Sequence, residues 1–319
     1  MEFKSKTILV IAHKYNDIIY AISTPEFKKA INRKLIILGD QEKYKNFPFL
    51  YFFQEIVYVK YKFSTINILI DLFRICANRK KIKCDCVFFV NPLLVIDQYI
   101  FRKSKAEACI WVEDGLMNYD PKSKSSSLLK SGFCSSLGKK MIQKILRVSN
   151  NLFPQYTLCT YLLCPLKATW FYGEKKQLVI DVEIVDLSVF SYIKGKKIFI
   201  GQNLYPQFCS IEQYCKLVNI VIEKYDIDYY VPHLCSSEKE KINANIIDLS
   251  KTQFTFEVIS AYLSFSIYSF GSSLLYTTKQ INSSIISNLI KVPFYDVSNF
   301  DVISSTVDYV WELEKNKNK

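Results

Sequence analysis

The sequence predicts an α/β protein of two domains, each built on a parallel sheet. Short, almost continuously apolar segments alternate with segments of helical periodicity, a pattern typical of a parallel sheet with helices on both faces. The chain has 319 residues, which is enough for two separate cores. Polar and basic residues interrupt the apolar pattern at 192–197, so we divide the chain into domains 1–190 and 191–319.

Five short runs in the first domain are expected to form strands, because they are rich in apolar and β-branched residues. They are Thr7–Ala12, Lys34–Leu38, Glu55–Val59, Cys86–Val90 and Glu107–Val112. Helical periodicity lies between them, for example over Thr65–Asn78. The sequence therefore predicts alternating strands and helices in the first domain.

The second domain repeats this alternation. Its expected strands are Lys197–Ile200, Asp228–Val231, Ser264–Phe270 and Val292–Tyr295. Its expected helices are Ile211–Lys224, Phe256–Tyr262, Ser283–Leu289 and a closing helix over Val302–Lys315. Because two open α/β sheets in tandem leave a cleft between them, we expect ligands there.

The composition excludes several classes of protein. Half of the residues are apolar and 15% are aromatic, which is typical of a globular chain and not of a disordered one. The ten cysteines lie mostly within apolar runs, and the closely spaced Cys84 and Cys86 do not match a zinc motif. We therefore expect buried free thiols and no metal. Residues 1–13 lack the features of a secretory signal, and no long apolar stretch is free of charge, so the sequence predicts a cytoplasmic protein with no membrane span.

The chain is basic, with a net charge of +12. Seven Lys or Arg residues and no acidic residue lie between positions 121 and 150. Within this segment, Leu137–Val148 has the pattern of an amphipathic helix. Its apolar residues Met141, Ile142, Ile145 and Leu146 lie near one face, and its basic residues Lys139, Lys140, Lys144 and Arg147 lie near the other. Two interpretations stay open: a helix that contacts an anionic membrane, or an ordinary surface helix. The segment has no nucleic-acid-binding signature, so we expect no nucleic acid partner.

Three groups of polar residues follow expected strands directly. Glu113, Asp114 and Gly115 follow the strand that ends at Val112, and His233 follows the strand that ends at Val231. The third group is Gly271, Ser272 and Ser273, after Phe270. A carboxylate that accepts a proton and an imidazole that donates one are sufficient for general acid–base chemistry. Serine hydroxyls and backbone amides in a turn bind phosphate oxygens.

Each group also has a plainer interpretation. Glu113 and Asp114 could belong to a solvated loop, and only one of two adjacent side chains needs to face the cleft. The glycines after strands, Gly115, Gly201 and Gly271, could serve only as turns. His13 also ends an expected strand and is a second candidate histidine. We favour His233, because Glu257 and then Ser272 and Ser273 follow it along the chain.

The order of these groups resembles the bacterial sialyltransferases. Glu113-Asp114-Gly115, then His233, then Glu257, then Ser272-Ser273 is similar to their acidic-acidic-Gly, His-Pro and Ser-Ser/Thr motifs. The resemblance is to glycosyltransferase family 52, the lipooligosaccharide and capsule sialyltransferases, and then to the bacterial polysialyltransferases. This chain departs from the family pattern in placing Pro232 before His233 instead of after it.

The resemblance implies a GT-B fold of two Rossmann-like domains and a CMP-sialic acid donor, with no metal. Glu113 or Asp114 would deprotonate the acceptor hydroxyl, Glu113 being the preferred base, and His233 would stabilise the departing phosphate. Ser272 and Ser273, with Gly271, would hold that phosphate, and Glu257 would bind the ribose. The residues after the first strand of the second domain, Gly201, Gln202 and Asn203, would approach the donor.

The sequence thus predicts an inverting sialyltransferase that builds a bacterial capsule or lipooligosaccharide glycan. Its acceptor sugar is expected to be galactose on a lipid-linked glycan, which would bring the enzyme to the inner face of the cell membrane. A polysialyltransferase or another GT-B nucleotide-sugar transferase is the nearest alternative. A non-catalytic basic protein that binds membrane or nucleic acid is the alternative from a different class.

Overall fold

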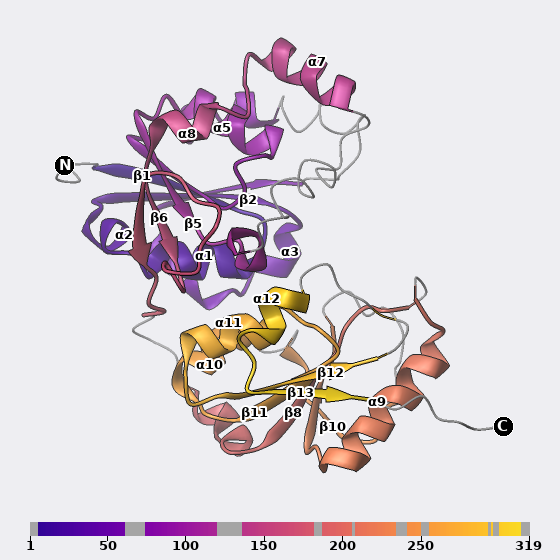
Figure 1. Ribbon diagram of the computed structural model, residues 1–319. Helices are drawn as coiled ribbons and strands as arrows, with labels where there is room; N and C mark the ends of the chain where they lie inside the picture. Colours follow the sequence, from indigo (N-terminus) through magenta and orange to yellow (C-terminus); the bar gives the residue numbers. More distant parts are fainter. Residues whose placement is uncertain are drawn as a thin grey trace. The chain divides into compact units, whose positions relative to one another are not determined.

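The computed structural model describes residues 6–60, 74–119, 136–181, 187–205, 208–233, 241–249, 255–292, 295 and 300–313. The chain forms two compact units, Met1–Glu183 and Ile184–Lys319. This division lies slightly before the one expected from the sequence, between residues 190 and 191. Each unit has its own parallel sheet (Figure 1).

The N-terminal unit contains a seven-stranded sheet in the order β3-β2-β1-β4-β5-β6-β7, in which every pairing is parallel. Its strands are β1 Thr7–Ala12, β2 Asn32–Leu38, β3 Glu55–Val59, β4 Cys86–Phe89, β5 Ala108–Val112, β6 Thr157–Leu162 and β7 Glu174–Gln177. Its helices are α1 Tyr15–Ile22, α2 Pro25–Lys29, α3 Gln41–Tyr44, α5 Val95–Ser104, α7 Ser136–Leu146 and α8 Leu152–Tyr156, with 3₁₀ turns η1 Pro48–Phe52 and η2 Gly115–Asn118.

The strand order of this sheet reverses between β1 and β4. From β1 the chain adds β2 and β3 on one side, and from β4 it adds β5 to β7 on the other. Since crossovers between parallel strands are right-handed, the two directions carry their helices to opposite faces. Figure 1 shows α1 and α2 on one face of the sheet and α5 and α8 on the other. The strands are therefore covered on both faces, which explains their continuous apolar sequences.

Aromatic rings fill the core on the α5 and α8 side of this sheet. Phe89 and Trp111 come from adjacent strands, and Phe153 comes from α8; all three have 0% exposure. The Phe89 and Phe153 rings are stacked with centroids 3.9 Å apart. The indole nitrogen of Trp111 donates to the carbonyl oxygen of Val90, which satisfies the one polar atom of this buried side chain.

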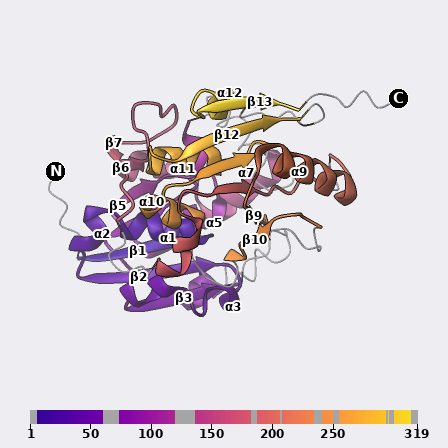
Figure 2. The same ribbon diagram turned by 90° about the horizontal axis from the view of Figure 1, so that it is seen from below.

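The C-terminal unit contains a six-stranded parallel sheet in the order β10-β9-β8-β11-β12-β13. Its strands are β8 Lys197–Ile200, β9 Tyr229–Val231, β10 Asn245–Ile246, β11 Ser266–Ser269, β12 Ile286–Lys291 and β13 Tyr309–Glu312. Its helices are α9 Ile211–Tyr225, α10 Phe256–Tyr262, α11 Leu274–Ile281 and α12 Phe300–Ser304, preceded by the 3₁₀ turn η3 Ser188–Ile193. The order reverses between β8 and β11, and α9 lies on the opposite face of the sheet from α10 and α11 (Figures 1 and 2).

Local signals define the ends of α9. Ser210 accepts a hydrogen bond from the backbone N–H of Gln213, and the Gln213 side chain accepts one from the backbone N–H of Ser210. This reciprocal cap satisfies two amides that a helix start would leave unpaired. At the other end Asp226 adopts a left-handed conformation with φ 53°, which ends the helix.

Most of the expected elements are confirmed, and three in the second domain are wrong. The closing helix over Val302–Lys315 is instead the short α12 followed by the strand β13. The expected helix Ser283–Leu289 is mainly β12, and Val292 and Tyr295 form only an isolated bridge. The expected helix Thr65–Asn78 lies largely outside the described residues.

The error at β12 has an identifiable cause. The apolar residues near β12 include Ile285, Ile286, Leu289 and Ile290, which have helical spacing in the sequence. A strand buried on both faces loses the alternation that would distinguish it from a helix. Pairing decides the outcome: Asp308 accepts from the Ser287 backbone N–H at 2.8 Å, and this contact starts the parallel register between β12 and β13.

Two further expectations concern cysteines and membrane spans. Of the eight described cysteines, all are free thiols and five are buried, as the sequence predicts. Within the described ranges, no helix has the length and apolar character needed to cross a bilayer.

Candidate functional site

In the N-terminal unit, polar residues gather where β1, β4 and β5 end. These three strands are adjacent in the sheet, and β1 and β4 flank the point where the strand order reverses. Ligands of open α/β sheets bind at this point, outside the carboxyl ends of the strands. His13 and Lys14 follow β1, Asn91 follows β4, and Glu113 and Asp114 follow β5. Glu113 and Asp114 are predicted from the sequence, and His13 is the second candidate histidine there.

His13 is held by two buried carboxylates. Its Nε2 lies 2.9 Å from Asp97 Oδ1, and its backbone N–H donates to Asp17 Oδ2 at 2.8 Å. Asp97 is 0% exposed and comes from the first turn of α5. Burial by itself lowers the pKa of the His13 imidazole, but the charge and hydrogen bond of Asp97 outweigh it and the net pKa is raised. A neutral His13 that donates from Nε2 to Asp97 carries its basic lone pair on Nδ1.

Asp114 is the more accessible of the two predicted carboxylates. Its side chain is 19% exposed and forms an ion pair with Lys14 at 2.9 Å. Asn91 Nδ2 donates to the other carboxylate oxygen of Asp114 at 3.4 Å, and the backbone N–H of Asp114 donates to Asn118 Oδ1 at 2.9 Å. The carboxylate is thus oriented at the switch point by residues from three segments of the unit.

Glu113 is completely buried. Its Oε2 accepts hydrogen bonds from the hydroxyl of Tyr119 and from the backbone N–H of Leu163, the latter at 2.6 Å. Burial raises the pKa of Glu113 to about 8, although both hydrogen bonds act to lower it. The carboxyl group is therefore mostly protonated at neutral pH, which makes it a poor proton acceptor in the resting protein.

Three of these carboxyl groups keep one oxygen without a hydrogen-bond partner among the described residues. The atoms are Asp17 Oδ1, Asp97 Oδ2 and Glu113 Oε1. Buried polar atoms in folded proteins nearly always have a partner, so several unsatisfied atoms near one strand edge are typical of a functional site. Asp17 and Asp97 were not predicted as site residues, because the sequence of a helix does not show which of its polar side chains points toward the protein interior.

In the C-terminal unit, the predicted donor residues gather at the corresponding edge of the second sheet. Gly201, Gln202 and Asn203 follow β8, His233 follows β9, and Gly271 follows β11 by two residues. The strands β9, β8 and β11 are adjacent, so these residues share the carboxyl edge at the point where the strand order reverses. Gln202 Oε1 is buried there without a partner among the described residues.

The turn before α11 has the features of an anion site. Gly271 has φ 133°, a conformation that favours glycine. The Ser272 hydroxyl oxygen accepts from the backbone N–H of Leu274 at 3.2 Å, so its hydrogen can be donated to a ligand. Ser273 is exposed and makes no side-chain cap to α11. The turn therefore presents hydroxyl donors at a helix N-terminus, where a phosphate is stabilised.

Glu257 and His233 are both half-buried. Glu257 lies in the first turn of α10, where Thr255 caps the helix by accepting from the backbone N–H of Val258 at 3.5 Å. His233 ends a described segment of the chain. Their predicted roles in ribose binding and phosphate stabilisation stay predictions.

Gly201 has a structural reason to be glycine. A Cβ at this position would lie 2.4 Å from the hydroxyl oxygen of Tyr230 and 2.9 Å from the carbonyl oxygen of Val231. Tyr230 is 0% exposed and its hydroxyl lies 3.1 Å from that of Tyr214, so it has little room to move. The packing of Tyr230 thus accounts for Gly201, and its predicted contact with a donor stays a prediction.

Replacing Gly201 by Ala should lower the free energy of unfolding by about 1–3 kcal/mol, because the added methyl group overpacks the core. Urea unfolding measures this effect. Gly39→Ala is the control: its Cβ would lie no closer than 3.5 Å to any atom outside its own neighbours, and it should change stability little. Equal stabilities of the two variants would contradict the packing explanation.

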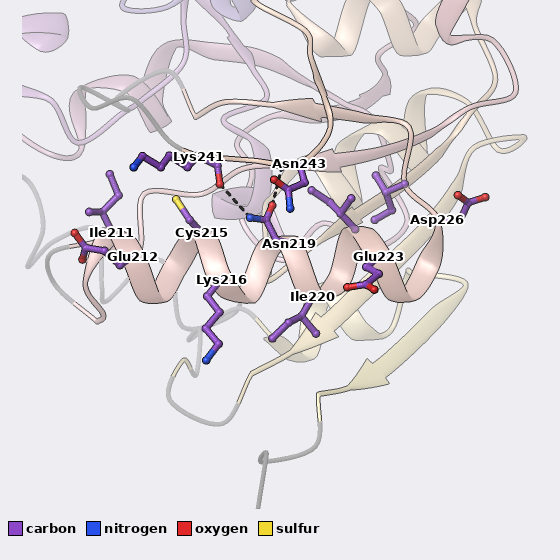
Figure 3. A pocket seen from close by; sticks show the side chains of 12 residues that line it. Ile211, Glu212, Cys215, Lys216, Asn219, Ile220, Glu223, Asp226, Lys241 and Asn243 are labelled. Atoms are coloured by element: carbon purple, nitrogen blue, oxygen red, sulfur yellow. Dashed lines mark hydrogen bonds between the residues drawn. The ribbon is translucent and has the colours of Figure 1, made fainter. Parts of the chain in front are cut away.

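A hollow lies elsewhere in the C-terminal unit, along α9 (Figure 3). Its volume is about 1160 Å³. Asn219 of α9 donates to the backbone carbonyl of Lys241 and accepts from the backbone N–H of Asn243, which connects the helix to the segment on the other side of the hollow. Its lining contains none of the predicted site residues, and it carries both acidic and basic side chains. We therefore place the candidate site at the strand ends and not in this hollow.

The described residues contain no group of three or more His, Cys, Asp or Glu side chains arranged to hold a metal ion. The absence of a metal from the reaction stays a prediction.

No family model matches the chain, and no curated protein matches its sequence. Among solved structures, the chain is similar to the glycosyltransferase SnogD from Streptomyces nogalater, with a TM-score of 0.56 at 10% identity over 97% of this chain and 87% of that one. It is similar to the spinosyn forosaminyltransferase SpnP, with a TM-score of 0.52 at 11% identity over 90% and 80% of the two chains. MnaA of S. aureus, solved with UDP, gives a TM-score of 0.51 at 12% identity over 95% and 83%.

The chain has the GT-B fold. The fold class implied by the resemblance is therefore confirmed. At identities this low, the similarity concerns the fold alone.

Proposed function

We propose that the protein is a glycosyltransferase that uses a nucleotide-sugar donor, and more specifically an inverting sialyltransferase. It would transfer sialic acid from CMP-sialic acid to a terminal galactose of a capsule or lipooligosaccharide glycan. The observation that carries the proposal is the pair of switch points, each lined by polar side chains with unsatisfied buried atoms. The glycosyltransferases of similar fold add support, and the motif order argues for sialic acid.

On the donor side, the proposal assigns the CMP phosphate to the turn before α11. The hydroxyls of Ser272 and Ser273 would hold its oxygens, with Gly271 allowing the close approach. His233 would donate a proton or a hydrogen bond as the phosphate departs, and Glu257 would bind the ribose. Departure of CMP requires stabilisation of negative charge more than covalent catalysis, and hydroxyl donors with an imidazole supply it.

On the acceptor side, the proposal assigns the base to the carboxylate pair after β5. Asp114 is the better placed of the two, because it is partly exposed and oriented by Lys14 and Asn91, whereas Glu113 is buried. The base would take the proton of the acceptor hydroxyl as its oxygen attacks the anomeric carbon. His13, positioned by Asp97, is the second candidate for the same step.

Calorimetry against free nucleotides tests the donor. We expect CMP to bind with much higher affinity than UDP or GDP, and Ser272→Ala to weaken CMP binding by about 10- to 100-fold, because a hydrogen bond to a charged group is lost. Ser264→Ala is the control, since Ser264 precedes β11 at the opposite end of the same strand and bonds to Ser284. Preference for UDP or GDP would indicate another nucleotide-sugar transferase, and no nucleotide binding would contradict the proposal.

The acceptor is tested by incubation with CMP-sialic acid and a panel of galactosides and sialosides, with mass spectrometry of the products. One added sialic acid on galactosides supports the proposal. Repeated addition to sialosides would identify a polysialyltransferase.

A further inference from the structure

The helix α7 is attached to its unit through a polar side chain. Gln143 is only 9% exposed, and its Nε2 donates to Gln98 Oε1 at 3.1 Å and to Asn150 Oδ1 at 2.8 Å. Gln98 lies on α5, is 0% exposed, and donates in turn to the carbonyl oxygen of Pro92 at 2.9 Å. Because these buried amides satisfy one another, they determine which side of α7 turns inward.

The opposite side of α7 carries apolar residues. Positions two before and two after Gln143 lie on the far side of a helix with 3.6 residues per turn. They are Met141 and Ile145, whose exposed fractions are 60% and 74%. Ile142 and Leu146 are half-buried at the border, and Leu146 packs against the core. The four apolar residues that the sequence places near one face are therefore divided, and two of them face away from the protein.

Basic residues flank the exposed pair on one side of the helix. Lys140, Lys144 and Arg147 are all exposed, and the described part of α7 and the turn after it contain no acidic residue. Arg102 of α5 is also exposed and donates to the backbone carbonyl of Arg147, which adds a fourth positive charge beside the helix. Two large apolar side chains beside a row of positive charge match the chemistry of an anionic bilayer surface.

We propose that α7 is a membrane-contacting helix that inserts Met141 and Ile145 among the acyl chains of an anionic leaflet. Lys140, Lys144 and Arg147 then contact the lipid headgroups. The charge of this face argues against a second copy of the chain as its occupant, because two such faces would bring like charges together. The proposal does not depend on the proposed activity, although it would place a transferase beside a lipid-linked acceptor.

Vesicle flotation of the full chain tests the proposal without any substrate. We expect binding to vesicles of phosphatidylglycerol and phosphatidylcholine, little binding to vesicles of phosphatidylcholine alone, and loss of binding at high salt. The double variant Met141→Ser, Ile145→Ser should weaken binding at least about tenfold, because the apolar area that enters the bilayer is lost. Lys140→Gln with Lys144→Gln should weaken it by about tenfold or more through lost attraction to the headgroups.

Ile31→Ser is the matched control, since Ile31 belongs to the same unit and is also 74% exposed. It should bind as the unchanged protein does, and circular dichroism should show that all variants are folded. Absence of binding to anionic vesicles overturns the proposal. Equal binding by the Met141 and Ile145 variant also overturns it, as does a dimer in solution that this variant abolishes.

Discussion

Replacing Asp114 by Asn should reduce the rate of sugar transfer by about 10²–10⁴-fold, with little change in donor affinity. The amide keeps the size of the side chain and can still accept from Asn91, but it cannot take a proton from the acceptor hydroxyl. Steady-state kinetics with the best acceptor of the panel measures the effect. Asp181→Asn is the control, because Asp181 also pairs with a lysine, Lys28, and is exposed in the same unit.

A different result is expected if His13 is the base. If His13 accepts the proton, His13→Asn carries the large loss and Asp114→Asn stays within about tenfold of the original rate. Asp97→Asn then acts through His13. Because Asp97 raises the pKa of the imidazole, its removal should move the acid limb of the pH–rate profile to lower pH. A merely structural role of Asp97 would lower the rate without moving this limb.

The stability of the protein should fall as the pH rises from about 5 to about 8.5, and Glu113→Gln should abolish much of this fall. The pKa of Glu113 is raised from 4.5 to about 8 in the folded protein, so between these values the folded state binds a proton that the unfolded state has released. The penalty for ionising Glu113 is therefore absent below about pH 4.5 and complete above about pH 8. It amounts to about 5 kcal/mol.

The amide of Glu113→Gln resembles the protonated acid. Its oxygen can accept from Tyr119 and Leu163, and its NH₂ group takes the position of Oε1. We expect the variant to be more stable by only about 1 kcal/mol near pH 5.5 and by much more near pH 8.5, measured by urea unfolding at each pH. Glu26→Gln, the control, removes an ion pair with Lys176 and should destabilise throughout. A constant difference between Glu113→Gln and the original protein would show that Glu113 is already ionised at pH 5.5.

Strand positions could be predicted wherever apolar runs are short and bounded. The runs at Thr7–Ala12, Glu55–Val59 and Lys197–Ile200 coincide with β1, β3 and β8. The prediction from sequence failed at β12, a strand in the interior of the sheet, and at β13, the edge strand beside it. In both segments the apolar residues have helical spacing. Their identity depends on the contact of Asp308 with Ser287 and on the pairing that follows, and no local pattern records such a contact.

The chemical types at the candidate site and their positions at strand ends follow from the amino-acid sequence alone, because each apolar run stops where a polar residue begins. Which of these groups can act as a base depends on the folded protein. Burial sets the protonation of Glu113, Lys14 and Asn91 orient Asp114, and an aspartate from α5 reaches His13 across 84 positions of the chain. The orientation of α7 also depends on the folded protein, since hydrogen bonds to Gln98 and Asn150 hold the Gln143 side chain on the buried side of the helix. Protonation and orientation depend on neighbours brought together by folding, and these neighbours are distant in the sequence.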